Sequence, residues 1–503
     1  MSTTASTLSP PSLRHLDRFF VGGEWVAAAS NDSIDVIDSG TEQVFFSIAA
    51  AAADDMARAV DAARIAFDEG PWPRMTHTER AGWIRQLAAG VQARGADLGQ
   101  LWPRESGVIY AVAQHAGRIG SGALEQYAAL ADTFPFEERV QPSLGGDFGL
   151  LVREPVGVVG AIIPWNAPTA LISHKIGPAL LAGCTVILKS APEAPGEGYV
   201  FAEVAEEIGL PPGVLNVLTA DREVSELLVT NPGVDKITFT GSTAAGRRIA
   251  SLCGERIARC TLELGGKSAA VILDDADLTK VAKVISRAEC AISGQVCSSL
   301  TRIVVPRRRH DELVDAIAAT FSKVRVGDPF DAETQMGPLA AERQRDRVEG
   351  YIAKGIEEGA TLATGGGRPK DLERGWYVEP TVFGNVDNHS AIATDEIFGP
   401  VLTVVPADDE QDAVRIANDS IYGLNASVFT EDNDRAREVA GQLRSGTVGQ
   451  NAFRTDFGMA FGGFKQSGIG REGGREGLLP FLETKSVILD GTPKGYEEAP
   501  KAG

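Results

Sequence analysis

Four short apolar runs decide the fold of this chain: VGVVGAII (156–163), CTVILK (184–189), VLNVLT (214–219) and KITFT (236–240). Stretches with the periodicity of a helix separate these runs. Strands that are apolar on both faces and alternate with helices are typical of a parallel sheet covered by helices on both sides. Ligands of such sheets bind beyond the carboxyl ends of the strands. The sequence therefore predicts an α/β protein with a ligand site at that edge.

The alternation of strands and helices resumes further along the chain. An apolar run at 268–273 is followed by helical periodicity and by apolar runs near 400–405 and 425–430, which together predict a second α/β domain. Directly before the first of the four apolar runs in the sequence, the pattern of residues 137–155 predicts a strand, a Gly-Gly turn and a second strand. A lone hairpin buries little surface, so we expect it to pair with something else, such as another subunit.

Length and charge restrict the class of protein. A chain of 503 residues is too long for one hydrophobic core, and 43% hydrophobic and 23% charged residues are ordinary for a soluble protein. The 68 acidic residues outnumber the 48 basic ones, for a net charge of −20. This balance argues against a nucleic acid or an anionic membrane as partner. Neither a signal peptide nor a transmembrane run is recognisable, so we expect a cytoplasmic protein.

The five cysteines do not suggest a structural role. They are odd in number and include no CxxC pair, so we expect neither a disulfide scaffold nor a metal site. The polar stretches 1–14 and 492–503 are expected to be loose tails.

Two motifs follow strands of the first sheet. TGSTAAG (240–246) places small residues where a strand turns into a helix, so that phosphate oxygens could approach the free N–H groups of the helix. An ordinary capped helix would show the same pattern. In LELGGK (262–267), Glu263 lies among leucines. If it is buried, its pKa rises and it becomes a candidate general base, whereas a Glu at a strand end can also point to solvent.

Two more motifs carry a nucleophile and an amide. Cys297 lies in GQVCSS (294–299), a glycine-bearing loop before a strand, where a side chain can face a cleft. A lone cysteine is more often buried and inert, as we expect for Cys290 in a helical stretch. Asn166, in PWN (164–166), follows the first strand and could donate to an oxyanion, although asparagine is also common in turns.

Together these motifs resemble those of the aldehyde dehydrogenase superfamily, in the same order. The shared motifs are PWN, LKSAPE, FTGST, LELGGK, GQVCSS, EIFGP and FGGFKQSGIGRE. The resemblance extends from GGEW (22–25) to LETK (482–485). It implies the fold of that family: a Rossmann-like cofactor-binding domain (1–136 and 156–265), an α/β catalytic domain (266–470) and a small β oligomerisation element (137–155 and 471–495). Members are usually dimers or dimers of dimers, so we expect a homo-oligomer.

The resemblance also implies roles for individual residues. Cys297 is similar to the nucleophile, Glu263 to the base that activates the deacylating water, and Asn166 to the oxyanion-hole amide. Lys175 in HKIGP is similar to a lysine near the proton path. The implied cofactor is NAD, with NADP possible, and no metal is needed. The residues that match cofactor-binding positions are Trp165, Lys189, Gly241, Ser242, Leu264, Glu396 and Phe398.

Three positions depart from the family pattern. Pro192 stands where NAD-preferring relatives often carry a Glu that binds the ribose hydroxyls, which weakens the expectation of strict NAD preference. Ala460 precedes FGG where proline is usual. Arg475 stands where many relatives have Glu, so we expect no second acid or base near the C-terminus.

The implied reaction is oxidation of an aldehyde to a carboxylic acid through a thioester on Cys297. Glu263 favours hydrolysis over transfer to coenzyme A. A cysteine hydrolase or a non-catalytic scaffold would not need the cofactor motifs and the catalytic positions together. The residues expected to line the substrate site are small or apolar: Ala167, Leu171, Val296, Ser298, Phe453 and Phe461. They favour an uncharged aliphatic, terpenoid or aromatic aldehyde. Arg454 is a nearby cation that could instead receive an acidic semialdehyde.

Overall fold

The structure, a computed structural model, describes residues 11–496. The first ten residues of the expected cofactor-binding domain, and residues 497–503 of the expected C-terminal tail, lie outside this range. The expectation of a loose tail over 1–14 is wrong for the part that is described. The backbone N–H of Arg14 donates to Glu203 (2.6 Å) and that of Ser12 donates to Asp97 (3.0 Å), so this segment is held against the body of the protein.

The predicted parallel sheet is confirmed and has eight strands in the order β19-β11-β10-β7-β8-β9-β1-β2. The five strands from β11 to β9 run parallel, while β19, β1 and β2 add antiparallel edges. The bounds are β1 Arg18–Val21, β2 Glu24–Ala27, β7 Val158–Ile162, β8 Thr185–Ser190, β9 Leu215–Thr219, β10 Lys236–Thr240, β11 Arg259–Glu263 and β19 Gly468–Ile469.

Helices cover both faces of this sheet, as the apolar character of its strands predicts. One face packs against α1 (Ala53–Asp68), α8 (Arg222–Thr230) and α9 (Thr243–Glu255). The helices of the other face are α2 (His77–Ala93), α3 (Gly95–Ser106), α4 (Tyr110–Ala113), α5 (Ala116–Ala129), α6 (Pro168–Ala182) and α7 (Gly196–Glu207). Thr76 and Glu79 form a capping box at the start of α2.

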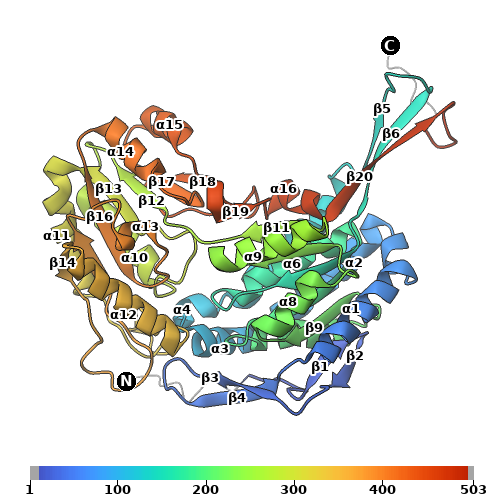
Figure 1. The fold of residues 1–503 in the computed structure, drawn as a ribbon, viewed down its shortest axis with the longest axis horizontal. Helices are drawn as coiled ribbons and strands as arrows, with labels where there is room; N and C mark the ends of the chain where they lie inside the picture. The colour runs from blue at the N-terminus through green and yellow to red at the C-terminus, as the bar shows by residue number, and fades with distance from the viewer. Residues whose placement is uncertain (1–10, 497–503) are drawn as a thin grey trace.

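The second predicted α/β unit contains a seven-stranded sheet in the order β14-β15-β16-β13-β12-β17-β18, beside the first body in Figure 1. Its strands are β12 Ala269–Ile272, β13 Arg302–Pro306, β14 Thr361–Thr364, β15 Thr381–Gly384, β16 Val401–Ala407, β17 Asn425–Phe429 and β18 Thr447–Gln450. Its helices are α10 Leu278–Cys290, α11 His310–Phe321, α12 Glu342–Glu357, α13 Ala391–Thr394, α14 Glu410–Asn418 and α15 Asn433–Gln442. A further hairpin, β3 (Ser33–Ile37) with β4 (Val44–Ala49), lies at the outer side of the first body.

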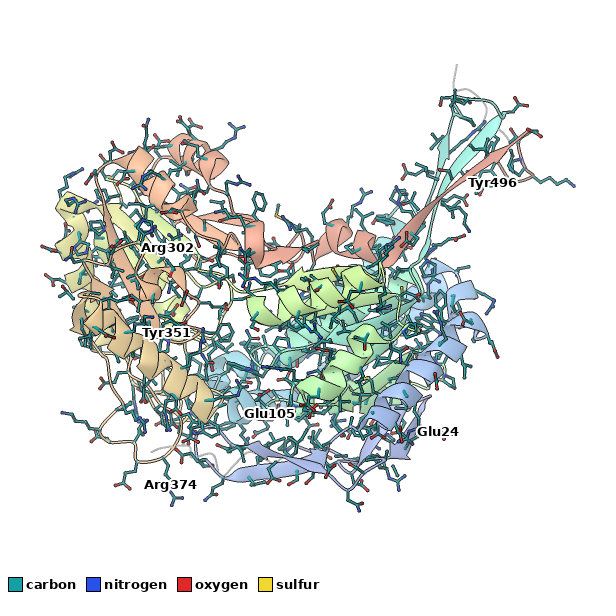
Figure 2. All side chains as sticks on the ribbon, in the orientation of Figure 1. Glu24, Glu105, Arg302, Tyr351, Arg374 and Tyr496 are labelled. Carbon is teal, nitrogen blue, oxygen red and sulfur yellow. The ribbon has the colours of Figure 1, made fainter. Side chains whose placement is uncertain are left out.

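A three-stranded sheet projects away from both bodies in Figure 1. The hairpin expected over 137–155 is formed by β5 (Glu137–Val140) and β6 (Phe148–Pro155). The other neighbour of β6 is β20 (Leu482–Leu489), the chain's own C-terminal strand, which follows the short helix α16 (Gly474–Leu478). Tyr496, labelled in Figure 2, packs edge-on against Phe148 and ties the chain beyond β20 to this sheet.

Within residues 11–496, no helix is long and apolar enough to cross a membrane. Nor does this part of the chain contain a group of three or more His, Cys, Asp or Glu residues placed to hold a metal ion.

Candidate active site

Three segments that are distant in sequence meet where the two large sheets approach each other. They are the loop after β7 with Asn166, the end of β11 with Glu263, and the loop between α10 and β13 with Cys297. The side-chain Nδ2 of Asn166 donates to the carbonyl oxygen of Gln295 (2.9 Å), two residues before Cys297. Gly266 lies so close to the Cys297 carbonyl oxygen that a Cβ would be only 2.4 Å from it. The structure thus brings the three expected catalytic residues together.

The loop that carries Asn166 is held by α3, a helix that the sequence had not linked to the site. Trp102 Nε1 donates to the carbonyl oxygen of Asn166 (2.8 Å), and Ser106 Oγ donates to that of Trp165 (2.6 Å). The amide of Gln295 in turn donates to the Ser106 carbonyl oxygen (3.1 Å). This network fixes the Asn166 loop and the Cys297 loop relative to each other.

The far end of the Cys297 loop is anchored by Arg302, labelled in Figure 2. This buried guanidinium donates to Asn388 Oδ1 (2.7 Å) and to the carbonyl oxygens of Ile416 (2.9 Å) and Ala417 (2.8 Å). Cys290, at the end of α10, is buried in the core as expected.

Cys297 itself is half-buried. Burial raises the pKa of its thiol, and the negative charges of Glu396 and Glu263 raise it further. The thiol is therefore protonated at neutral pH in this state, and attack on a carbonyl requires a group that takes its proton.

Glu263 is the last residue of β11 and is only 2% exposed, so it does not point to solvent. Neither of its carboxyl oxygens has a hydrogen-bond partner. Burial, and then the charge of Glu472, raise the pKa of Glu263 well above its usual range, against the opposite effect of Lys175. A carboxyl group with a raised pKa is a stronger base than an ordinary glutamate once it is ionised.

The sequence analysis assigned no second acid or base near the C-terminus, yet the structure has a buried carboxyl group there. Glu472 is buried and forms an ion pair with Lys175 of α6. Arg475, the residue on which the expectation depended, is exposed, with its guanidinium over the Phe134 ring. The buried acid in REGGREG (471–477) is Glu472, the first of its two glutamates, and nothing in the local sequence distinguishes it from Glu476.

Most of the expected cofactor-binding residues lie at the carboxyl ends of the first sheet's strands. Gly241 and Ser242 connect β10 to α9, where the Ser242 hydroxyl caps the helix through the N–H of Ala245 (3.3 Å). The neighbouring Thr243 hydroxyl is buried without a partner. Lys189, near the end of β8, is buried, and burial lowers its pKa to about 8.

The other expected cofactor contacts lie beside Cys297 or α9. Glu396 accepts from the backbone N–H of Gly266 (3.3 Å), and burial raises its pKa to about 7. Phe398 has a positive φ of 62° and meets Trp165 edge-on, with ring centroids 5.4 Å apart. Leu264 packs against α9, where a Cβ on Gly246 would be 2.4 Å from its side chain.

Comparison with known proteins identifies the family of this chain. The model of the aldehyde dehydrogenase family matches residues 25–487. The chain belongs to the aldehyde dehydrogenase family. It is therefore an oxidoreductase that acts on aldehydes.

Similar family members cover nearly the whole chain. Geranial dehydrogenase of Castellaniella defragrans is 45% identical, over 94% of this chain and 98% of that protein. An aldehyde dehydrogenase of Mycobacterium tuberculosis, solved with NAD+, is 45% identical with a TM-score of 0.92 and covers 97% of this chain and 100% of its own. A mutant aldehyde dehydrogenase C of Pseudomonas syringae, solved with NAD+ and octanal, is 37% identical with a TM-score of 0.92 (96% and 99% covered).

The aromatic residues beside the site of this aldehyde dehydrogenase differ in part from those that the sequence predicted. Phe453 packs against the core around α10 and α11. Phe457, which the sequence did not single out, stacks on Phe461 (4.4 Å between centroids) and on His174 (4.1 Å). The remaining expected residues flank Asn166 and Cys297: Ala167 and Leu171 at the start of α6, Val296 and Ser298 beside the thiol.

Proposed function

We propose that this aldehyde dehydrogenase uses a nicotinamide dinucleotide to oxidise its substrate through a thioester on Cys297, which is hydrolysed by a water that Glu263 activates. The observation that carries the proposal is the pairing of a protonated thiol with a buried carboxyl group that has no other partner. A structural carboxylate would be hydrogen-bonded, because an unsatisfied buried charge is costly.

Acylation begins when Glu263, in its carboxylate form, takes the thiol proton of Cys297 directly or through water. The thiolate then attacks the carbonyl carbon of the aldehyde. The developing oxyanion is stabilised by the backbone N–H of Cys297 and by Asn166, whose amide has a second N–H beyond the one bonded to Gln295. Each such donor typically contributes about 10²–10³ to the rate.

The residues around α9 fit a dinucleotide. The N–H groups at the start of this 13-residue helix and the unpartnered Thr243 hydroxyl suit a pyrophosphate, while Lys189 suits ribose hydroxyls. Glu396 would hold the second ribose beside Cys297. The bound nicotinamide would accept the hydride from the tetrahedral carbon and leave the thioester. The NAD+ complexes of the two solved relatives support NAD as the cofactor, with NADP possible.

Deacylation depends on Glu263 again, after the proton taken from the Cys297 thiol has left it toward the Lys175–Glu472 ion pair. It removes a proton from water, and the hydroxide attacks the thioester carbon and releases the Cys297 thiolate with the acid. The proton then leaves Glu263 toward the Lys175–Glu472 ion pair, which is buried and close enough to influence the Glu263 charge. A buried base of this kind is not needed for transfer to coenzyme A, so it favours hydrolysis.

An uncharged aliphatic, terpenoid or aromatic aldehyde is the proposed substrate class. The aromatic stack of His174, Phe457 and Phe461 supplies flat apolar surfaces near the site. Burial lowers the pKa of His174 to about 3, so this ring is neutral. Arg454, the candidate partner of an acidic semialdehyde, is exposed and donates to the carbonyl oxygen of Gln450. The names of the geranial and octanal-bound relatives point the same way.

Domain limits and assembly complete the proposal. We assign cofactor binding to 1–136 and 156–265, and the catalytic domain to 266–470. The β5–β6–β20 sheet, within 137–155 and 471–495, is assigned to homo-oligomer formation, because it projects from the body and exposes Leu144 (99%) and Ile488 (62%). The proposed compartment is the cytoplasm.

The deciding experiment incubates the purified protein with geranial, octanal, benzaldehyde and succinic semialdehyde, each with NAD+ and with NADP+. Reduced cofactor is followed by absorbance and the acid by mass spectrometry. We expect stoichiometric acid and reduced cofactor, fastest with an uncharged aldehyde. Ester hydrolysis without any cofactor reduction would instead identify a cysteine hydrolase.

A further inference from the structure

Two cysteines outside the active site face each other where α9 packs against β11 (Figure 1). Cys253 lies in the last turn of α9 and is only 1% exposed. Cys260 is the second residue of β11, and it shares a face of the strand with Leu262 because side chains alternate along a strand. Cys253 and Leu262 belong to the hydrophobic core beneath α9, and Cys260 packs against that core. The two thiols are therefore directed toward each other, which is the first requirement for a disulfide.

The turn between the two cysteines brings them together in a strained conformation. The N–H of Ala258 donates to the carbonyl oxygen of Cys253 (2.9 Å) and that of Ile257 to the carbonyl oxygen of Gly254 (3.3 Å), which is the pattern of a Schellman helix end. Such an end needs a positive φ before Ala258 and usually has glycine there, but this chain has Ile257 with a φ of 56°. A β-branched residue is strongly disfavoured in this conformation, and the Ile257 side chain is 81% exposed, so its burial does not compensate. The turn returns the chain at once, so that Cys260 comes back beside Cys253.

The two sulfur atoms are close enough to influence each other's ionisation. A side-chain hydrogen bond between the thiols lowers the pKa of Cys260 and raises the pKa of Cys253. The ammonium group of Lys236 favours the ionised form of both, and the guanidinium of Arg256 favours that of Cys253. Cys260 is therefore the sulfur that carries a negative charge, and Cys253 remains a thiol beside it. A thiolate with a neighbouring thiol is the arrangement from which a disulfide forms.

Cys260 differs in this respect from the other cysteines. Burial raises the pKa of Cys184 to about 11, and it also raises the thiol pKa of Cys290 and of Cys297. Oxidants react with the thiolate, so Cys260 is the most readily oxidised sulfur before substrate and cofactor bind. It is also partly exposed, whereas Cys253 is buried, so a small oxidant meets Cys260 first.

We propose that Cys253 and Cys260 are a redox modification site, at which a hydroperoxide converts the two thiols into a disulfide that joins α9 to β11. The Cys260 thiolate attacks the peroxide oxygen and becomes a sulfenic acid, and the O–O bond breaks to release an alcohol, or water from hydrogen peroxide. The Cys253 thiol then attacks the sulfenic sulfur, so that the S–S bond forms and water leaves. Two thiols are oxidised and one peroxide is reduced, and a dithiol reductant reverses the modification.

The position of this site separates it from the dehydrogenase reaction. The disulfide lies at the start of β11, whereas Glu263 lies at the end of the same strand. No step of the modification uses Cys297, so the proposal does not depend on the proposed function. Peroxide consumed at Cys260 does not reach the catalytic thiol, and the oxidised protein therefore keeps Cys297 as a thiol.

The test treats the reduced full-length protein, in the absence of cofactor, with one equivalent of hydrogen peroxide. We expect a mass lower by two hydrogen atoms, loss of two titratable thiols after denaturation, and recovery of both with dithiothreitol. Trypsin cleaves after Arg256 and after Arg259, between the two cysteines, so the disulfide joins peptides 249–256 and 260–267 in a non-reducing digest. A digest in which these peptides remain separate, or in which Cys297 is the first residue oxidised, would overturn the proposal.

Variants assign the two roles and supply the controls. Cys253→Ala lacks the second thiol, so a sulfenic acid should persist on Cys260 and be trapped there by dimedone. Cys297→Ala should form the disulfide at the wild-type rate, so this experiment is independent of whether Cys297 is the catalytic nucleophile. Cys290→Ala removes another buried thiol and should also leave the rate unchanged. Dimedone on a residue other than Cys260 in Cys253→Ala, or loss of disulfide formation in Cys297→Ala, would contradict the assignment.

Discussion

The side-chain amide of Asn166 donates a hydrogen bond of 2.9 Å to the carbonyl oxygen of Gln295, two residues before Cys297. This bond links the end of β7 to the loop that carries the nucleophile. It also turns the amide toward that loop, so that its second N–H is available to an oxygen bound next to the thiol.

Replacement of Asn166 by Ala should lower the rate of acylation by about 10²–10³, because one of the two oxyanion donors is lost. The magnitude is measured from the burst phase of cofactor reduction with a saturating aldehyde. Asn166→Asp serves as the control, since a carboxylate keeps the size of the side chain but repels an oxyanion, and it should be at least as slow. A burst in Asn166→Ala as fast as that of the wild type would remove the amide from the oxyanion hole.

Cys297→Ala should abolish both cofactor reduction and ester hydrolysis while NAD+ still binds. The second buried thiol nearby, Cys290, offers a matched control: it lies in the core of α10, and Cys290→Ala should retain turnover. Cofactor binding is measured by quenching of tryptophan fluorescence. If Cys297→Ala produced reduced cofactor above trace amounts, the nucleophile would have to be another residue.

Much of this site could be predicted from the sequence, because each catalytic residue lies in a short motif next to a strand. Cys297, Glu263 and Asn166 were recognisable for that reason, and the parallel sheet followed from its apolar strands. The residues that support them were not. Trp102 and Ser106 act through backbone carbonyl oxygens of a distant loop, and Glu472 is distinguished from Glu476 only by its contact with Lys175. Such contacts depend on tertiary packing, which leaves no local pattern.

Glu263→Gln should form the acyl-enzyme more slowly than the wild type, because the base that takes the thiol proton is lost, and should hydrolyse it more slowly still. The expected result is one burst of reduced cofactor per active site followed by little steady-state turnover, with the acyl adduct visible in the intact mass. Normal turnover would assign the base to another residue. An amide cannot take the proton of water, whereas the nicotinamide charge can still assist ionisation of the Cys297 thiol.

The pH dependence of deacylation should follow the raised pKa of Glu263. Burial favours the neutral carboxyl, which is not a base, so the active fraction grows as the pH rises and is lost as the pH falls through the raised pKa. Glu472→Gln removes the neighbouring negative charge that raises this pKa. The pH profile of single-turnover deacylation should therefore move to lower pH in Glu472→Gln. A shift of the profile to higher pH would contradict this prediction and would show that breaking the ion pair with Lys175 affects the Glu263 pKa more than removing the Glu472 charge does.

Cofactor preference should be looser than in relatives that carry Glu at the position of Pro192. A carboxylate there would accept hydrogen bonds from the ribose hydroxyls and repel a 2′-phosphate, and proline does neither. The adjacent acid, Glu193, is not free to replace it, because it is paired with Arg343 of α12. Lys189 remains near the end of β8 and can serve either a hydroxyl or a phosphate. We therefore expect measurable activity with NADP+, with NAD+ still preferred.

Pro192→Glu should shift the ratio of kcat/KM values toward NAD+. A carboxylate that accepts a hydrogen bond from the ribose or repels the 2′-phosphate changes the relative activation free energy with the two cofactors by about 1–3 kcal/mol. This corresponds to roughly five- to a hundredfold in that ratio. Pro192→Gln is the matched control: it offers a hydrogen-bonding oxygen without the charge, so it should improve NAD+ use while excluding NADP+ far less. Arg343→Ala tests the neighbouring acid, since release of Glu193 from its ion pair should move the preference in the same direction as Pro192→Glu. If the wild type already rejects NADP+ and none of the three variants changes the ratio, the selectivity is set by residues elsewhere in the cofactor site.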